Sequence, residues 1–149
     1  MRIAVVHGPN LQLLGRREPD VYGAATLTTV DEAVSQLAED LDVEVESFQS
    51  NHEGQLLDYV AEAGERVDGF LVNAGGLTHT SVSLRDGLVG VGRPFVEVHL
   101  SNTAAREDFR SASLLAPVAL GVVAGFGPRS YLLGLRALVG HLTEEGAGS

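Results

Sequence analysis

RIAVVHGPN, at residues 2–10, is a short apolar run that passes directly into a polar turn containing proline. The apolar part, from Ile3 to Val6, is short, continuous and rich in β-branched residues, which is typical of a buried strand. Similar runs recur along the chain. We therefore expect five strands, at residues 2–6, 43–48, 69–72, 95–98 and 118–123.

Amphipathic segments separate these runs. Val30, Val34 and Leu37 fall at helical spacing, and Thr29 with Glu32 forms a candidate capping box ahead of them. We expect further helices at 56–61, 82–89 and 131–142, and a short helical turn near 105–109. The alternation predicts an α/β fold, a flavodoxin-like five-stranded parallel sheet with helices on both faces, and a Rossmann-type strand order is the alternative.

Composition indicates one globular domain, residues 1–149, with a Gly/Glu-rich tail at 143–149 that is expected to fray. No apolar run has membrane-spanning length and the N-terminus shows no secretory pattern, so we expect a soluble, cytoplasmic protein. A formal net charge of −10 argues against nucleic acid as a partner. The chain has no cysteine and its ten basic residues are all arginine, which excludes thiol nucleophiles and Schiff-base lysines.

Polar segments that contain glycine or asparagine follow each expected strand. They are HGPN at 7–10, SNHEG at 50–54, NAGGLTHT at 73–80, HLSN at 99–102 and GFGP at 125–128. Ligands of open parallel sheets bind outside the carboxyl ends of the strands. We therefore expect all five segments, with four of the five histidines, to gather at one edge of the sheet and form a site.

The connection GPNLQLLGRREPDVYG, at residues 8–23, is long for a small domain and places Tyr22 near Arg16 and Arg17. A free phenol has a pKa of roughly 10, and a neighbouring guanidinium lowers that pKa because it favours the charged form. An ionised Tyr22 would be basic enough to remove a proton from the carbon next to a ketone. The alternative is structural: the ring packs beneath the loop and the hydroxyl caps a backbone group.

Glu97 and His99 lie two residues apart at the end of an expected strand, so their side chains share a face. A carboxylate in this position can orient a histidine and keep it protonated, which suits a general acid. The backbone N–H groups of the following Leu-Ser-Asn segment offer a seat for a substrate carboxylate. The alternative is a solvated strand end without chemistry.

Other polar residues allow two interpretations each. Asn73 beside two glycines, and His79 after it, fit either a ligand site or a turn and a helix start. Arg106 and Arg110 are four apart and could clamp an anion, or pair with acidic neighbours at the surface. The histidines fall on separate loops and no G-x-G-x-x-G motif follows the first strand, so we expect no metal and no nucleotide or flavin cofactor.

The assembled motifs resemble the type II dehydroquinases, the 3-dehydroquinate dehydratases that use neither metal nor Schiff base, over nearly the whole chain. The motifs that carry the resemblance are GPNLQLLGRREPDVYG at 8–23, QSNHEG at 49–54, VNAGGLTHTSVSLRDGL at 72–88, VEVHLSN at 96–102, AREDFR at 105–110 and GFGPRSYLLGL at 125–135. The resemblance implies a lyase of the shikimate pathway or of quinate breakdown. It would remove water from 3-dehydroquinate in an anti elimination through an enolate, without a cofactor.

The resemblance also implies roles for individual residues. Tyr22 would be the catalytic base and Arg17 the cation that lowers its pKa, while Asn10 would hold a water on the enolate oxygen. His99 would protonate the departing hydroxyl, with Glu97 as its orienting partner. The substrate-holding positions would be Asn73, His79, Leu100, Ser101, Arg110 and, supplied by a neighbouring subunit of a dodecamer built as a tetramer of trimers, Asp86.

Some positions differ from the common family pattern, although none removes a proposed catalytic group. They are His7, Gln12, Ala74, Leu77, Ser111 and Ala112. The rival hypothesis from another functional class is a flavodoxin-like module that binds a ligand at the same edge without catalysis. A receiver-like sensor would need an acidic cluster after the first strand and a late lysine, and the chain has neither.

Overall fold

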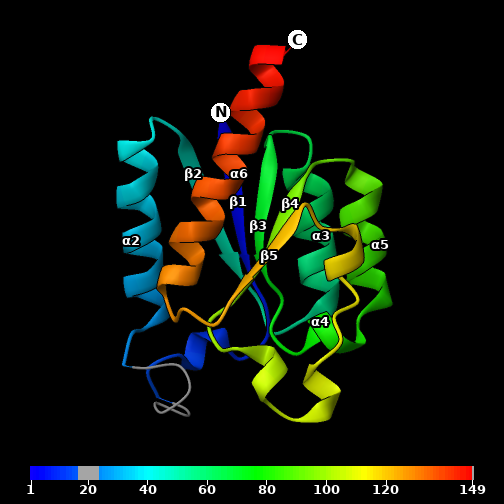
Figure 1. Ribbon diagram of the computed structural model, residues 1–149. Coiled ribbons are helices and arrows are strands. Elements are labelled where there is room, and N and C mark those ends of the chain that lie inside the picture. Colours follow the sequence, from blue (N-terminus) through cyan, green and yellow to red (C-terminus); the bar gives the residue numbers. More distant parts are fainter. Residues whose placement is uncertain (17–23, 149) are drawn as a thin grey trace.

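The computed structural model describes residues 1–16 and 24–148, which form a central sheet with helices on either side (Figure 1). Strands β1 (Arg2–His7), β2 (Glu44–Gln49), β3 (Gly69–Asn73), β4 (Phe95–His99) and β5 (Gly121–Ala124) all run parallel. Their order across the sheet is β2-β1-β3-β4-β5. This is the flavodoxin-like order, so that prediction is confirmed and the Rossmann-type alternative is wrong.

Two helical layers bury the two faces of the sheet. Helices α2 (Leu27–Asp40) and α6 (Arg129–Gly148) cover one face, and α3 (Glu53–Ala63) and α5 (Val82–Val91) cover the other (Figure 1). The alternation of side chains along β1 explains both cores, because Ile3 and Val5 pack into the first and Ala4 and Val6 into the second. Within residues 1–16 and 24–148, no helix has both the length and the apolar character needed to cross a bilayer.

The fifth strand begins later than expected. Residues 116–118, which include Val118, form a 3-10 turn, η4 (Ala116–Val118), and β5 starts only at Gly121. Pro117 explains the difference, because proline has no N–H to give to a strand ladder and suits the first positions of a helical turn. The run of valines alone did not reveal this break.

Helix ends also differ from the sequence pattern. The capping box of α2 joins Thr26 and Thr29, not Thr29 and Glu32: the Thr29 N–H donates to Thr26 Oγ1 at 3.2 Å, and the Thr26 N–H donates to Thr29 Oγ1 at 2.9 Å. The threonine hydroxyl at the third helical position therefore replaces the expected glutamate. The last helix, α6, begins at Arg129 and continues to Gly148, so it includes most of the tail that we expected to fray.

Candidate active site

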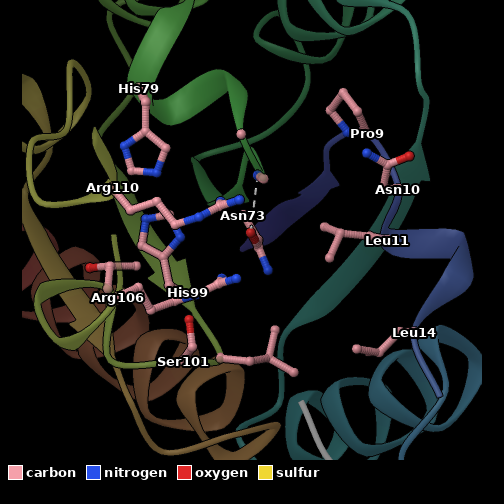
Figure 2. A pocket seen from close by; sticks show the side chains of 14 residues that line it. Pro9, Asn10, Leu11, Leu14, Asn73, His79, His99, Ser101, Arg106 and Arg110 are labelled. Atoms are coloured by element: carbon pink, nitrogen blue, oxygen red, sulfur yellow. Dashed lines mark hydrogen bonds between the residues drawn. The ribbon is translucent and has the colours of Figure 1, made fainter. Parts of the chain in front are cut away.

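A cavity opens where β1, β3 and β4 end (Figure 2). Its walls come from the loops after these strands, from helix α4 (Leu77–Thr80) and from the 3-10 turns η2 (Thr103–Ala105) and η3 (Asp108–Arg110). This is the expected position for a ligand of an open parallel sheet. Of the predicted site residues, those that line it are Asn10, Asn73, His79, His99, Leu100, Ser101 and Arg110.

The loops after β2 and β5 were also expected at the site, but they support its walls instead of lining it. The Asn10 N–H donates to Asn51 Oδ1 at 2.9 Å, and the Gly127 N–H donates to the Leu100 carbonyl at 2.9 Å. Four histidines lie at or just after the carboxyl ends of β1 to β4, as expected, but not all of them line the cavity. His79 and His99 line the cavity, whereas His7 is buried inside the fold and His52 is exposed ahead of α3.

His99 stands in the cavity wall with its ring held by Glu97. His99 Nε2 lies 2.7 Å from Glu97 Oε2, and the exposed fractions of the two side chains are 9% and 2%. The expectation that the two share a face is confirmed, and their burial does not fit a solvated strand end. Ser113 donates a 2.6 Å hydrogen bond to Glu97 Oε1. With Nε2 engaged by the carboxylate, Nδ1 is the ring nitrogen left for proton exchange with a ligand.

Asn73 ends β3 at the floor of the cavity and is held on both sides of its carboxamide. Its Oδ1 accepts the Gly75 N–H at 3.2 Å, and its Nδ2 donates to the Tyr131 hydroxyl at 3.0 Å. An amide nitrogen has two hydrogens, so one N–H remains for a ligand. Asn73 is therefore a fixed donor rather than a turn-forming residue alone.

The loop after β1 approaches the loop after β3 closely. A Cβ atom on Gly8 would lie 2.2 Å from the Ala74 carbonyl oxygen, so only glycine allows this approach. Asn10, two residues later, has φ of 72°, in the left-handed region that asparagine tolerates better than most residues. The close packing and the turn direct Asn10 to the wall opposite His99 (Figure 2).

Two arginines make one side of the cavity basic. Arg106 and Arg110 both line it, although they come from separate short turns and not from one helix face as expected. Arg110 Nε donates a 2.6 Å hydrogen bond to Glu107 Oε2 and so also makes the surface pair of the alternative interpretation. The backbone of Glu107 itself and then the Arg110 guanidinium lower the pKa of that carboxyl group. Guanidinium groups at a cavity wall suit an anionic ligand.

His79 is oriented by main chain from across the cavity rim. Its Nδ1 lies 2.7 Å from the Ala112 carbonyl, so Nδ1 carries the hydrogen and donates. The ring lines the cavity next to Arg110 (Figure 2). Its Nε2 is therefore the nitrogen that can accept from, or exchange with, a ligand.

Some predicted residues are not in the cavity wall. Glu97 stands behind His99, and Asp86 is exposed on α5 away from the cavity lining. Tyr22 and Arg17 lie outside the described residues, so their roles stay predictions. Among the residues that the structure does describe, no three His, Cys, Asp or Glu side chains form a group that could hold a metal ion.

Two residues behind the site were missed by sequence reasoning. Ser113 holds Glu97, and the fully buried Tyr131 at the start of α6 holds Asn73. Ser113 lies in a loop with no pattern of its own. Tyr131 gave a weak signal, because a hydroxyl in an otherwise apolar stretch of helix requires a buried hydrogen-bond partner.

The chain is similar to known proteins over nearly its whole length. The family model described as Dehydroquinase class II matches residues 1–139. A 3-dehydroquinate dehydratase of Gloeobacter violaceus is 56% identical over 138 residues, which are 93% of this chain and 86% of that protein. A 3-dehydroquinate dehydratase of Geotalea daltonii is 51% identical over 144 residues, 97% of this chain and 100% of that protein. The crystal structure of the type II dehydroquinase from Butyrivibrio crossotus has a TM-score of 0.91 at 38% identity, and the match covers 93% of this chain and 97% of that one.

Proposed function

The chain belongs to the dehydroquinase class II family, and on that premise we propose that it is a hydro-lyase that converts 3-dehydroquinate into 3-dehydroshikimate and water. The reaction would serve the shikimate pathway or the breakdown of quinate. It uses no cofactor in this proposal, because each step is assigned to a side chain or to backbone N–H groups.

The observation that carries the proposal is that His99, held from behind by Glu97, stands in the wall of a cavity that is also lined by two arginines. Removal of water needs a proton donor for the departing hydroxyl, and a histidine held by a carboxylate is suited to donate. His99 Nδ1 would give its proton to that hydroxyl as the carbon–oxygen bond breaks. Glu97, 2.7 Å from Nε2, would stabilise the charged ring before the transfer.

The first step of the elimination needs a base and a place for negative charge. We assign the base to Tyr22, ionised beside Arg17, which would take the proton from the carbon next to the ketone. The electrons of the broken carbon–hydrogen bond would then form the enolate. Asn10 would hold a water on the enolate oxygen, a preorganised donor where charge develops.

Substrate binding follows from the charge of the cavity wall. The substrate carboxylate would be received by the backbone N–H groups of Leu100 and Ser101, with Arg110 nearby. The hydroxyl groups of the substrate would be held by the Asn73 amide and the His79 ring. Hydrogen bonds within the protein already fix the orientation of both groups.

The test is to mix the protein with 3-dehydroquinate and follow the ultraviolet absorbance of the conjugated enone product. A rise in absorbance that scales with protein concentration supports the lyase. Saturable binding of 3-dehydroquinate without any product would instead support the non-catalytic binding module.

The role of Tyr22 gives a separate prediction. Tyr22→Phe should lower kcat by several powers of ten, because general-base catalysis contributes about 10²–10⁴-fold and the enolate cannot form without it. KM should stay nearly unchanged, since the variant keeps the ring, which would contact the substrate in this role. Steady-state kinetics measure both, and a variant that keeps its turnover would refute the role of the phenolate.

Assembly and location complete the proposal. We expect a cytoplasmic homo-oligomer, a dodecamer built as a tetramer of trimers, in which a neighbouring subunit supplies Asp86. Support comes from α5, where Asp86 is exposed between Val82 and Val89, two valines with exposed fractions of 59% and 54%. Light scattering together with activity tests this, and a fully active dilute monomer would contradict it.

A further inference from the structure

A line of hydrogen-bonded polar side chains runs from helix α2, past the carboxyl end of β1, to the floor of the cavity. Asp31 Oδ1 lies 2.8 Å from His7 Nε2, His7 Nδ1 lies 2.9 Å from the Tyr131 hydroxyl, and that hydroxyl accepts from Asn73 Nδ2 at 3.0 Å. His7 and Tyr131 are fully buried, and Asn73 is 3% exposed. None of the steps assigned above uses His7, Asp31 or Tyr131.

Counting donors and acceptors fixes the direction of every hydrogen bond in this line. The Tyr131 oxygen accepts from Asn73, and the single hydrogen of this buried phenol would have no acceptor among the described contacts unless it points at His7 Nδ1. Nδ1 is then the bare nitrogen of the ring, and the hydrogen on Nε2 donates to the Asp31 carboxylate. The line is satisfied only by the neutral Nε2–H form of His7.

The Tyr131 hydroxyl is able to remain the hydrogen-bond donor to His7 Nδ1. Burial in the core raises the pKa of Tyr131, so the hydroxyl retains the hydrogen that it donates. At the outer end, Ser47 Oγ donates to the same Asp31 oxygen at 3.0 Å, which holds the carboxylate toward His7. The rings of His7 and Tyr131 also pack against each other, with centroids 5.3 Å apart.

We propose that His7 and Tyr131, anchored by Asp31, are positioning residues that hold the Asn73 carboxamide in one orientation, with one N–H directed at the substrate. This inference rests on the proposed function for the identity of the substrate. The opposite orientation of Asn73 would set its NH₂ group against the Gly75 N–H, two donors face to face. It would also leave the Tyr131 oxygen without the hydrogen that it now receives.

An apolar core would be the simpler way to fill this space, which is why the line points to function. Buried polar groups are costly unless each is hydrogen-bonded, and aromatic or aliphatic residues would avoid that requirement. The polar line borders the apolar core that contains Ile3 and Val5, and it ends at Asn73, a residue of the cavity wall.

The first experiment compares two substitutions that each remove one buried or half-buried phenol hydroxyl. Tyr131→Phe should raise KM for 3-dehydroquinate about tenfold, the effect of one misplaced hydrogen bond. Its kcat should change less than about threefold, because a contact made equally in ground and transition states affects KM alone. Tyr59→Phe is the control, since Tyr59 donates to Glu46 on the other face of the sheet, away from the cavity. A KM for Tyr131→Phe that matches the control overturns the proposal.

The second experiment determines which nitrogen of the His7 ring carries the hydrogen, and it uses the unliganded protein. Long-range ¹⁵N–¹H correlation spectra should show His7 with its hydrogen on Nε2 and a bare Nδ1, and Asp31→Ala should change that pattern. His7 found with hydrogen on Nδ1, or on both nitrogens, overturns the proposal. This measurement needs no substrate, so it separates failure of the positioning line from failure of the proposed dehydratase activity.

Discussion

Two histidines of this chain each hold a carboxylate at nearly the same distance, but they differ in what the other ring nitrogen faces. His99 Nε2 is 2.7 Å from Glu97, and His7 Nε2 is 2.8 Å from Asp31. The ring of His99 lines the cavity, whereas His7 Nδ1 is closed off by the Tyr131 hydroxyl. The same two groups can therefore move a proton in one place and hold a neighbour still in the other.

The carboxylates of the two pairs differ in exposure, and the order is the reverse of that of the histidine rings. Glu97 is 2% exposed and Asp31 is 33% exposed, so the pair that faces the cavity has its carboxylate deep in the protein. A buried carboxylate cannot be compensated by water and depends on its protein partners. In this chain, the pair that lines the cavity combines an enclosed carboxylate with a second ring nitrogen that faces the cavity, and the buried His7 pair does not.

The largest expected effect tests this difference directly. His99→Gln should lower kcat by about 10²–10⁴-fold, because it removes the proposed general acid. His7→Gln should lower kcat by less than about tenfold, since it acts only through Asn73. His141→Gln serves as the control, because His141 pairs with Glu145 on the surface of α6. Equal losses of kcat in the His99→Gln and His7→Gln variants would contradict the assignment of different roles to the two pairs.

The carboxylates should show the next largest difference. Glu97→Gln should lower kcat by roughly 10- to 100-fold, the kinetic equivalent of a charge-assisted hydrogen bond. Asp31→Asn should change kcat by less than about threefold, because water reaches that group and the ring it holds does not react. Steady-state kinetics at saturating substrate measure both values, and a more damaging Asp31→Asn would reverse the assignment.

Each carboxylate also receives a serine hydroxyl, which allows a matched comparison of stability. Ser113→Ala should lower the free energy of unfolding by about 1–3 kcal/mol, because it leaves Glu97 Oε1 buried without its donor. Ser47→Ala should change it by less than about 0.5 kcal/mol, since the Ser47–Asp31 contact is exposed. Urea unfolding of both variants provides the measurement, and equal losses would show that burial is not what separates the two pairs.

The smallest expected effect concerns alkaline pH. Burial raises the pKa of Tyr131, so above about pH 10 the unfolded chain releases a proton that the folded chain keeps. The free energy of unfolding should therefore fall as pH rises, by at most about 1.4 kcal/mol per pH unit for this group. Tyr59, whose pKa is raised by burial and then by Glu46, adds a similar slope. Tyr131→Phe should remove about half of the combined slope in urea unfolding between pH 9 and 11, and an unchanged slope would contradict it.

Local patterns were sufficient for four of the five strands and for part of the site. The apolar runs around Ile3 and Phe95 predicted β1 and β4 because buried parallel strands have no polar alternation. The Glu97–His99 contact followed from a spacing of two residues. The pattern failed at Val118, where Pro117 prevents strand pairing, and at the capping box, where several hydroxyl side chains compete.

The residues that hold the site could not be found in this way. His7 contacts Asp31 and Tyr131, which are 24 and 124 positions away, and Ser113 follows Glu97 by 16 positions. These contacts depend on how helices and loops pack against the sheet, which no local period records. The side chains that line the cavity were thus more predictable than the side chains that hold them.

The hydrogen bond between His79 and the carbonyl of Ala112 has a practical consequence. Only the main chain of residue 112 takes part, and its side chain is exposed, so this position can accept a new side chain while the ring stays anchored. The chain contains no cysteine of its own. Ala112→Cys would therefore create a single attachment point for a fluorophore at the rim, from which occupancy of the cavity can be followed in real time.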